Sequence, residues 1–368
     1  MLKQKKISLS TSFILCFFLL FCACKNQLLK TQHHNSNKKT NLFIMTYNVE
    51  NLFDIKDDPK KDDETFLPYA LKKNKKHHAH CAKIRNYKWK KQCFDLNWDK
   101  IAYETKLKNI AHVIALQNKN NGPDILFLQE IENINVLQDL NQLLPKKVQF
   151  QSISLIEGQD TRGIDVAIMS KLPLKQAPQL FHIPFDNISN ERKKDTRGIL
   201  HAQYTLPDGK SLGTYSIHFP APYHPKQLRQ QALTFLNQLQ KKHQHLDYHI
   251  AAGDFNVSRE ESDKTLIFQK IAQKQWLTPH LSAKAYVNKS NVGSNYYAKK
   301  KSWSFLDVIL LSQNFTDNQQ WEYTNDSFHI LNNAFIMQDQ SNKPKSYNFV
   351  SKQGVSDHFP VALNIELQ

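Results

Sequence analysis

Five short polar segments contain side chains that could together cleave a phosphoester. Their members are carboxylates, carboxamides and histidines: Asn48 and Glu50, Glu130, His218, Asp254 and Asn256, and Asp357 with His358. Carboxylate and amide oxygens suit Mg²⁺, which in turn binds phosphate oxygens. A carboxylate can deprotonate water, and a histidine can protonate or stabilise a phosphate. With no Ser or Cys in a nucleophile-elbow context, the set predicts metal-assisted phosphoester hydrolysis.

Taken one at a time, these residues have ordinary structural explanations. Asp254 could cap a turn, Asn48 could occupy a left-handed kink, and His358 could be a hydrogen-bonded loop histidine. The functional interpretation rests on the whole set and on its position, because each segment follows or precedes a predicted strand. Polar side chains gathered at strand ends are what an active site on a rigid sheet requires.

The elements that would position this set alternate between strand and helix from residue 42 onward. Short β-branched and aliphatic runs bounded by Gly, Pro, Asn or Asp predict strands at 42–47, 124–129, 164–169, 199–206, 211–218, 248–253, 305–311 and 360–366. Apolar residues at helical spacing predict helices within 99–118 and 225–242. No linker divides residues 42–368, so we expect one large α/β domain.

The positive charge of the chain belongs mainly to two appendages of this domain. Lys and Arg number 49 against 33 Asp and Glu, a net charge of +16. Residues 1–40 and residues 56–91 contribute +7 each, which leaves +2 for the remainder. Such a balance favours anionic partners, namely nucleic acid, phosphoesters or an anionic membrane face. The hydrophobic content of 40% excludes global disorder.

Residues 56–97 interrupt the alternation of strands and helices and are predicted to be a basic insertion. The segment contains two prolines, a run of Lys and His, and two cysteines. Its lysines are interleaved with Tyr69, Tyr87 and Trp89, a pattern suited to tracking a nucleic-acid backbone. A solvated surface loop is the alternative.

Residues 1–23 are predicted to be a signal peptide. Three lysines precede an apolar run at 13–23, which is too short to span a membrane permanently. Ala23 stands before Cys24 as in a bacterial lipobox, so we expect acylation of Cys24, with simple cleavage near Ala23 as the alternative. Residues 24–41 are polar and are predicted to be a tether. The expected protein is exported, either as a membrane-anchored lipoprotein in the periplasm or on the cell surface, or secreted.

Cys81 and Cys93 are the cysteines that remain once the signal peptide and the lipidation site are set aside. In an exported protein, two such cysteines most simply form one disulfide. A zinc site is the alternative, and it would recruit two of His77, His78 and His80 in a spacing that matches no standard zinc finger.

Seven motifs, in order, resemble the endonuclease/exonuclease/phosphatase superfamily, which includes deoxyribonucleases, exonuclease III-like repair enzymes, inositol polyphosphate phosphatases and neutral sphingomyelinases. The motifs are TYNVENLF (46–53), LQEIEN (128–133), RGIDVAIMS (162–170), SIHFPAP (216–222), AAGDFNV (251–257), FLDVILLS (305–312) and GVSDHFPVAL (354–363). The resemblance extends from about residue 42 to 366. It implies a four-layered α/β sandwich, in which two mixed β-sheets face each other between outer helices.

The resemblance also implies a role for each polar residue. Glu130 is similar to the family's metal-binding glutamate, Asn48 resembles the asparagine that supports the metal and phosphate, and Glu50 stands where an acidic metal-shell residue often lies. Asp254 resembles the aspartate that prepares the attacking water, and Asn256 the residue that holds a phosphate oxygen. The implied cofactor is Mg²⁺, with Mn²⁺ or Ca²⁺ as alternatives.

The closing motif and three further positions complete the implied site. Asp357 and His358 match an aspartate–histidine pair whose histidine contacts the scissile phosphate, and Asp307 matches the aspartate that orients this histidine. His218 resembles the second histidine of deoxyribonuclease-type members. Arg162 stands where some members place a phosphate-contacting tyrosine, and its guanidinium could clamp phosphate instead.

Three functions are compatible with these observations. The first is a nuclease, most simply an endonuclease, because the basic insertion suits a polynucleotide. The second is a phosphoesterase acting on lipids or small molecules, sphingomyelinase-like or inositol-phosphatase-like, because a cationic face also suits an anionic lipid surface. The third is a non-catalytic binding protein, which the intact polar set argues against. We prefer an exported, monomeric nuclease with nucleic acid as substrate, a membrane anchor at Cys24 and no protein partner.

Overall fold

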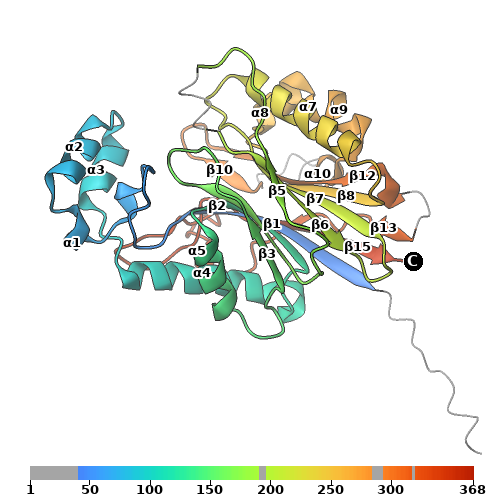
Figure 1. The fold of residues 1–368 in the computed structure, drawn as a ribbon, viewed down its shortest axis with the longest axis horizontal. Helices are drawn as coiled ribbons and strands as arrows, with labels where there is room; N and C mark the ends of the chain where they lie inside the picture. Colours follow the sequence, from blue (N-terminus) through green and yellow to red (C-terminus); the bar gives the residue numbers. More distant parts are fainter. Residues whose placement is uncertain (1–39, 190–195, 284–292, 317–319) are drawn as a thin grey trace, which may run out of the picture. The chain divides into compact units, whose positions relative to one another are not determined.

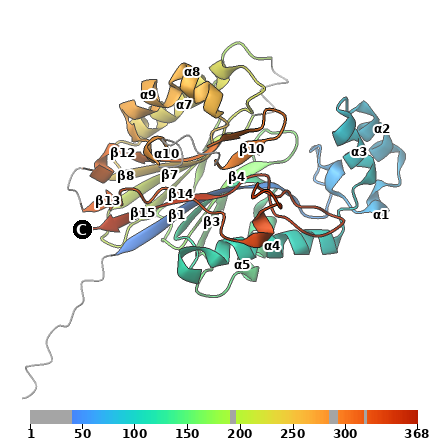
Figure 2. The same ribbon diagram turned by 180° about the vertical axis from the view of Figure 1, so that it is seen from behind.

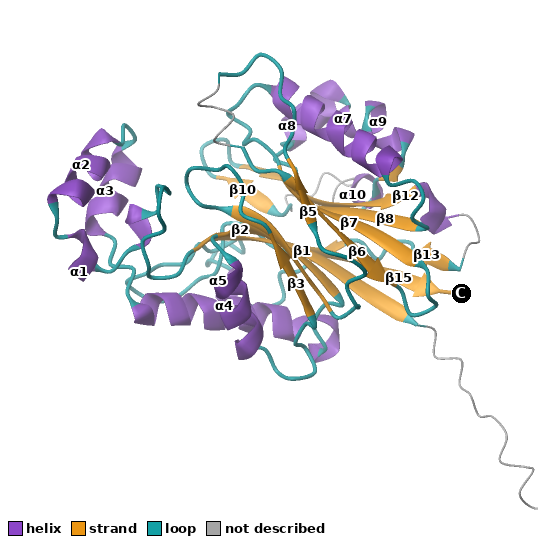
Figure 3. Ribbon diagram, viewed as in Figure 1, coloured by secondary structure: helices purple, strands orange, loops and turns teal. Residues whose placement is uncertain are grey.

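The computed structural model describes residues 40–189, 196–283, 293–316 and 320–368. These residues form two mixed β-sheets stacked face to face, with helices on both outer sides (Figure 1) (Figure 3). The four-layered sandwich expected from the sequence motifs is therefore confirmed. The predicted signal peptide, Cys24 and most of the predicted tether lie outside the described residues.

The first sheet has the strand order β13-β15-β1-β2-β4-β3, and β14 also pairs with β15. The bounds are β1 Asn41–Leu52, β2 Ile125–Ile131, β3 Ser152–Leu155, β4 Asp165–Ser170, β13 Trp321–Tyr323, β14 His329–Ile330 and β15 Val361–Leu367. β1 and β2 run parallel, whereas β15 pairs antiparallel with β1, with Asn41 opposite Glu366. The carboxyl ends of β1 and β2 and the start of β15 consequently share one edge.

The second sheet has the strand order β5-β6-β7-β8-β12-β9. The bounds are β5 Gln179–Phe181, β6 Ile199–Thr205, β7 Ser211–His218, β8 Tyr248–Asp254, β9 Trp276–Leu277 and β12 Asp307–Ser312. β7 and β8 run parallel, and β6 and β12 run antiparallel to them. A separate hairpin joins β10 Asn295–Tyr297 to β11 Ser302–Ser304.

Helices cover the outer face of each sheet (Figure 2). α4 Lys100–Asn120 and α5 Ile134–Leu143 pack on the first sheet, and α7 Lys226–Lys242, α8 Arg259–Thr265, α9 Ile267–Lys270 and α10 Pro279–Ser282 belong to the side of the second. Short 3-10 turns occur at Glu64–Phe66, Ala272–Lys274, Gln313–Thr316 and Phe335–Met337. In the described part of the chain, no helix combines the length and the apolar character that a membrane crossing needs.

Three hydrophobic cores hold these layers together. Successive strand residues point to opposite faces of a sheet, so Ile44 packs between the sheets while Met45 packs against α4 and α5. In the second sheet, Ile250 likewise belongs to the core between the sheets, and Ala251 to the core beneath α7. Burial on both faces accounts for the continuous apolar runs in the sequence.

The predicted basic insertion contains three helices, α1 Tyr69–Lys72, α2 Lys75–Lys83 and α3 Tyr87–Asp95 (Figure 1). We call residues 69–95 the α1–α3 unit. A disulfide joins Cys81 of α2 to Cys93 of α3, as predicted. Because the two sulfurs are bonded to each other, the alternative of a zinc site built on these thiolates does not hold.

The eight predicted strands all occur, as β1, β2, β4, β6, β7, β8, β12 and β15, and the two predicted helices are α4 and α7. β1 is longer than predicted, because the strand continues through residues 48–52, where polar and apolar residues alternate in part. α5 and the helices of the insertion were not predicted from the sequence.

Candidate active site

Both sheets deliver polar side chains to the same edge. In the second sheet, the strand register places His218 and Asp307 on either side of Asp254. In the first sheet, Asn48 of β1 and Glu130 of β2 lie at the ends of parallel strands. The Nδ2 of Asn48 donates to Asp254 Oδ2 at 3.1 Å and to Glu130 Oε1 at 3.3 Å. One buried amide therefore links the carboxylates of the two sheets.

Irregular backbone directs two of the carboxylates. The pairing register of β1 shifts directly after Asn48, and that of β2 shifts around Glu130. Glu50, Asn51 and Glu130 have positive φ angles of 53°, 57° and 65°. Such backbone is costly for residues with a side chain and clusters at functional sites, as bulges do. The N–H of Asn51 donates to Glu130 Oε2 at 2.9 Å, so the two bulges hold each other in place.

A glycine allows β7 and β8 to bring their terminal residues together. Gly253 has a φ of 149°, and a Cβ at this position would lie 1.9 Å from the carbonyl oxygen of Ile217. Only glycine fits this close approach. The neighbouring residues His218 and Asp254 then stand side by side, with Nε2 3.6 Å from Oδ2.

His358 is held in its charged form. The residue precedes β15, and its backbone N–H donates to Ser356 Oγ, which in turn donates to the carbonyl of Asn48 at 2.7 Å. Its Nδ1 donates to Asp307 Oδ2 at 2.7 Å. Burial lowers the pKa of His358, but Asp307, Asp357 and Asp254 outweigh burial and raise the pKa well above its ordinary value. The side chain of Asp357 is 51% exposed, and its Oδ1 lies 3.9 Å from His358 Nε2.

His218 is held in the opposite state. Burial, together with the charges of Arg197 and Arg162, keeps the pKa of His218 well below its ordinary value. Arg197 is buried, and its Nη2 lies 3.0 Å from His218 Nε2, which accepts from it. Asp160 pairs with Arg197 at 3.3 Å and with Arg162 at 3.7 Å. Two histidines whose environments drive their pKa values apart are typical of sites with separate acid–base roles.

Asp254 combines burial with several hydrogen bonds. It is 2% exposed, and its Oδ1 accepts the backbone N–H of Asn256 at 2.8 Å. Burial raises the pKa of Asp254 to about 7, against the opposing effects of His358 and of the hydrogen bonds from Asn256 and Asn48. The side-chain amide of Asn256 donates to the carbonyl of Phe219 at 2.9 Å, which fixes Asn256 behind Asp254.

Three further acids, Glu50, Glu130 and Asp357, lie close enough at this edge for Glu130 and Asp357 to raise the pKa of Glu50. Burial, reinforced by nearby Asp357, raises the pKa of Glu50 to about 8 against the opposing charge of Lys106. Among the described residues, the buried Glu50 Oε2 has no hydrogen-bond partner. Lys106 gives its hydrogen bonds to the carbonyls of Glu50 and Asn51 rather than to carboxylates. A cation beside Glu50 would favour its ionised form, and carboxylate oxygens are ligands suited to Mg²⁺.

Possible ligand atoms of Asp254, Asp307 and His358 all lie within 4.8 Å of one another. The Nδ1 of His358 is already bonded to Asp307, and Asp254 accepts from Asn48 and Asn256. Because the Nδ1 of His358 and both oxygens of Asp254 already have hydrogen-bond partners, this group is better suited to proton chemistry than to metal binding.

Three residues of this neighbourhood were not predicted. Arg197 lies two residues before β6, which runs antiparallel to β7, so inspecting strand starts as well as strand ends would have found it. Lys106 lies on the apolar stripe of α4, where a buried lysine is an unusual signal. Asp160 has no such signal, because it lies in a loop and acts only through the two arginines. Arg162 was predicted, and its side chain is 51% exposed beside Asp160.

Comparison with known proteins finds the same architecture elsewhere. A family model described as the endonuclease/exonuclease/phosphatase family matches residues 90–367. A crystal structure of a family protein from Bacteroides thetaiotaomicron is 14% identical, with a TM-score of 0.52 over 90% of this chain and 99% of that one. A second, from Bacteroides vulgatus, is 15% identical, with a TM-score of 0.52 over 90% of this chain and 100% of that one.

A third similar structure contains a ligand. It is D. rerio TDP2 complexed with a single strand DNA product, 15% identical, with a TM-score of 0.52 over 89% of this chain and 99% of that one. At such identities the likeness concerns the fold. No curated protein matches the chain significantly.

Proposed function

Since the chain belongs to the endonuclease/exonuclease/phosphatase family, whose members are phosphoesterases, we propose that it is a divalent-metal-dependent phosphodiesterase acting on nucleic acid. One observation carries the proposal: the amide of Asn48 bonds both Glu130 and Asp254. A carboxylate suited to a cation and a carboxylate suited to deprotonating water are thereby held on either side of one side chain. Metal-assisted attack of water on a phosphodiester needs this pairing.

In this proposal Asp254 is the general base, because a pKa of about 7 lets it take a proton from water near neutral pH. The resulting hydroxide attacks phosphorus, and the P–O bond to the leaving oxygen breaks. His358 is the imidazolium that stabilises the phosphate charge and protonates the leaving oxygen. Asp307 orients His358 through its 2.7 Å hydrogen bond. Asn256 positions Asp254 from behind through its backbone N–H.

Positively charged side chains lie beside these acids. Arg197 brings positive charge beside neutral His218, and half-exposed Arg162 extends this charge outward, toward where a phosphate would bind. Glu130, Glu50 and Asp357 would hold the cation, with Asn48 supporting Glu130. When bound there, Mg²⁺, or Mn²⁺ or Ca²⁺ in its place, would neutralise charge that develops on the phosphate.

Two observations favour nucleic acid over lipids or small phosphoesters. Residues 56–91 carry a net charge of +7, which suits a polyanion. A protein of the same fold, D. rerio TDP2, holds a single strand DNA product. We also propose export, because the sequence before residue 24 has the pattern of a signal peptide, and because Cys81 and Cys93 form a disulfide. Acylation of Cys24 belongs to the same proposal.

The test is a parallel assay of the chain lacking residues 1–23, with Mg²⁺, on plasmid DNA, RNA, sphingomyelin and inositol phosphates. We expect nucleic acid to be cleaved, activity to disappear in EDTA, and added Mg²⁺ to restore it. Full activity in EDTA would remove the metal from the proposal. Hydrolysis of sphingomyelin or inositol phosphates without cleavage of nucleic acid would replace the substrate.

A further inference from the structure

The α1–α3 unit presents unbalanced positive charge to solvent. Residues 69–95 contain nine Lys and Arg and a single acid, Asp95, which pairs with Lys91 at 2.7 Å. On α2, the buried residues are His77 and Cys81. Helical spacing therefore places the exposed lysines of α2 on the opposite side, and these are Lys75, Lys76 and Lys83.

These lysines do not stabilise the helices that carry them. Lys75 and Lys76 open α2, and neither α2 nor α3 has an acid in its first turn. Positive charge at a helix amino terminus opposes the helix dipole. Capping is instead provided by asparagines, since Asn74 accepts from the N–H of His77 and Asn86 from that of Trp89. The positive charge is thus retained at a cost to the local structure.

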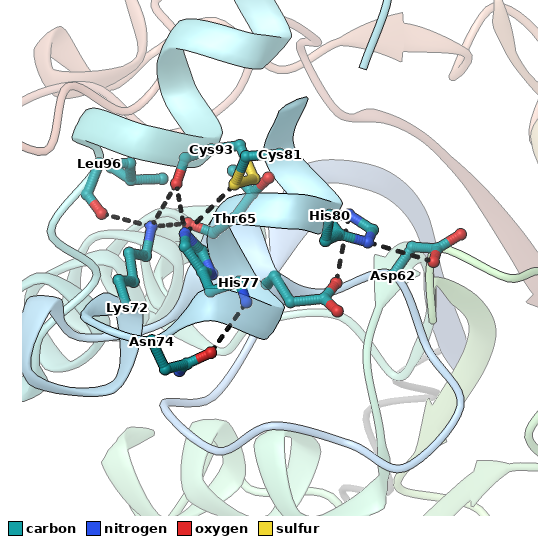
Figure 4. Close-up of a disulfide and its surroundings, with 10 residues drawn as sticks. Asp62, Thr65, Lys72, Asn74, His77, His80, Cys81, Cys93 and Leu96 are labelled. Carbon is teal, nitrogen blue, oxygen red and sulfur yellow. Dashed lines mark hydrogen bonds and ion pairs between the residues drawn. A yellow bond between two sulfur atoms is a disulfide. The ribbon is translucent and has the colours of Figure 1, made fainter. Parts of the chain in front are cut away.

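The interior of the unit is built from other contacts (Figure 4). The disulfide joins α2 to α3, and buried Lys72 donates to the carbonyls of Thr65 at 2.8 Å, Cys93 at 3.2 Å and Leu96 at 2.6 Å. His77 Nε2 lies 3.1 Å from the carbonyl of Cys93. The outer lysines are therefore free of any role in the core of the unit.

Aromatic side chains accompany these cations. Tyr87 is 79% exposed, Trp89 54% and Tyr69 45%. Proteins that bind single-stranded nucleic acid combine lysines for the phosphates with exposed aromatics on which bases stack. Membrane-surface helices instead need a continuous apolar face of their own, and here the apolar sides of α2 and α3 face each other around the disulfide.

The segment that leads into the α1–α3 unit, residues 53–66, is held beside the candidate active site. The chain leaves the site through β1, and Phe53 stacks on Phe66 with ring centroids 4.3 Å apart. The N–H of Asp62 donates to the carbonyl of Thr161 at 2.7 Å, and Lys61 Nζ donates to that of Asp160 at 3.2 Å. The segment leading into the unit is thus bonded to the loop that carries the predicted phosphate clamp, Arg162.

We propose that the α1–α3 unit is a docking surface for single-stranded nucleic acid, which lysines of α2 and α3 hold by its phosphates and on which Trp89 and Tyr87 stack bases. The inference deepens the proposed nuclease function and rests on it for the choice of polymer. In this proposal the α1–α3 unit binds the nucleic acid, and the candidate active site at the edge of the sheets cleaves it.

The test measures binding separately from cleavage. Fluorescence anisotropy of a fluorescein-labelled 20-nucleotide oligo(dT) is followed in EDTA for the chain lacking residues 1–23. Lys75→Gln with Lys76→Gln should weaken binding and flatten its salt dependence by about 0.7 in log–log slope per lost phosphate contact. Trp89→Ala should weaken binding roughly 5- to 150-fold at an unchanged salt slope, since stacking contributes about 1–3 kcal/mol per base. Trp89→Phe should restore part of this loss.

A matched control uses Lys146 and Lys147, an adjacent exposed pair between α5 and β3. Changing both to Gln removes the same charge outside the unit and should leave binding nearly unchanged. Circular dichroism and a mass-spectrometric check of the disulfide establish that each variant is folded. Equal losses from the two lysine pairs, or no loss from Trp89→Ala, would overturn the docking surface.

Two further measurements distinguish this proposal from a membrane-binding surface and from the proposed catalytic function. If the chain binds phosphatidylglycerol vesicles through Lys75 and Lys76 but does not bind oligo(dT), the surface is a membrane surface and the inference is wrong. Hydrolysis of bis(4-nitrophenyl) phosphate with Mg²⁺ reports on the active site alone. Cleavage of this small diester without oligonucleotide binding rejects docking and leaves catalysis intact. Oligonucleotide binding without cleavage of any diester rejects the catalytic proposal and leaves docking intact.

Discussion

The candidate active site and the α1–α3 unit handle charge in opposite ways. At the sheet edge, carboxylates are buried and fixed by side-chain hydrogen bonds, such as that of Asn48 to Asp254 at 3.1 Å. In the α1–α3 unit, the lysines are exposed to solvent, and one disulfide crosslinks the interior. Chemistry requires reacting groups at set distances, which two packed sheets supply. Holding a polymer requires charge density and stacking surface, which a small helical unit can supply.

The two scaffolds also differ in what makes them stable. The sheets bury a continuous core, whereas α2 and α3 contain nine residues each. Isolated helices shorter than about 12–15 residues are marginal in water. The α1–α3 unit therefore depends on its disulfide and on the packing of the preceding residues 53–66. The two regions should therefore respond separately to mutation, and the following experiments test that separation.

The largest effect is expected from Asp254→Asn. This change keeps the shape of the side chain and removes the proposed base, so kcat should fall by about 10²- to 10⁴-fold, or roughly 3–5 kcal/mol of activation free energy. Steady-state kinetics on an oligonucleotide measures kcat and KM, and circular dichroism monitors the fold. Oligo(dT) binding in EDTA should be unchanged, because the docking surface lies elsewhere. A folded variant with full activity would contradict the role of Asp254.

The next effect is expected from Cys81→Ser combined with Cys93→Ser. Closing a loop of this length stabilises a structure by about 3 kcal/mol in the chain-entropy model. Without the disulfide, local unfolding of the α1–α3 unit should therefore become far more frequent. Hydrogen exchange should speed up in α2 and α3, while amides of β1 and β8 keep their protection. Hydrolysis of bis(4-nitrophenyl) phosphate should persist. Loss of protection in the sheets as well would show that the two regions are not separable.

A smaller effect is expected from Glu130→Gln. Replacing a proposed ligand by a neutral amide should raise the Mg²⁺ concentration for half-maximal rate by at least about tenfold, because cation affinity depends on ligand charge. A Mg²⁺ titration of the hydrolysis rate measures this shift. Binding of oligo(dT) in EDTA serves as the internal control and should not change. An unaltered Mg²⁺ midpoint would mean that Glu130 is not a ligand.

The last effect is on stability rather than on catalysis: it concerns pH and tests whether acid destabilises the second sheet. Beneath α7, the rings of His201 and His243 stack with centroids 4.1 Å apart. Burial, aided by neighbouring histidines, lowers the pKa of His201 to about 3 and that of His249 to about 4. In the unfolded chain these groups titrate near 6.5.

The sign of this effect follows from the proton balance. Between pH 6.5 and about 4 the unfolded state binds more protons than the folded state, so the free energy of unfolding should fall as pH falls through this window. Urea unfolding at pH 7.5 and pH 5, followed by tryptophan fluorescence, measures the change. His249→Gln should make the pH dependence shallower, and an identical dependence in this variant would assign acid sensitivity to other groups.

Much of the fold could be predicted, because the buried strands appear in the sequence as continuous apolar runs. Residues 125–128, for example, fill cores on both sides of β2. The polar residues that follow such runs could be gathered into one set, because the ends of parallel strands share an edge. α5 escaped prediction, since its apolar residues Val136, Leu137 and Leu140 form only a short stripe in a polar segment.

What could not be predicted depends on tertiary neighbours. Arg197 matters because β6 brings it against His218, a contact between residues 21 positions apart. Glu50 is unusual because a bulge leaves one buried oxygen without a hydrogen-bond partner in the described chain, which residue type alone does not indicate. The helices of the α1–α3 unit lack a broad apolar stripe, because a disulfide replaces much of the hydrophobic contact that such a stripe would provide.

The direction of β1 has a practical consequence for handling this protein. β1 runs for 12 residues from Asn41 toward the site, a length of roughly 35–40 Å. Glu366 pairs with Asn41, so the described domain begins and ends at the same end of the sheet, opposite the catalytic residues. A bead or an affinity tag attached after Gln368 therefore lies on the far side of the sheet and leaves the catalytic residues open to the surrounding solution. Protein immobilised in this way should keep the turnover of the free protein.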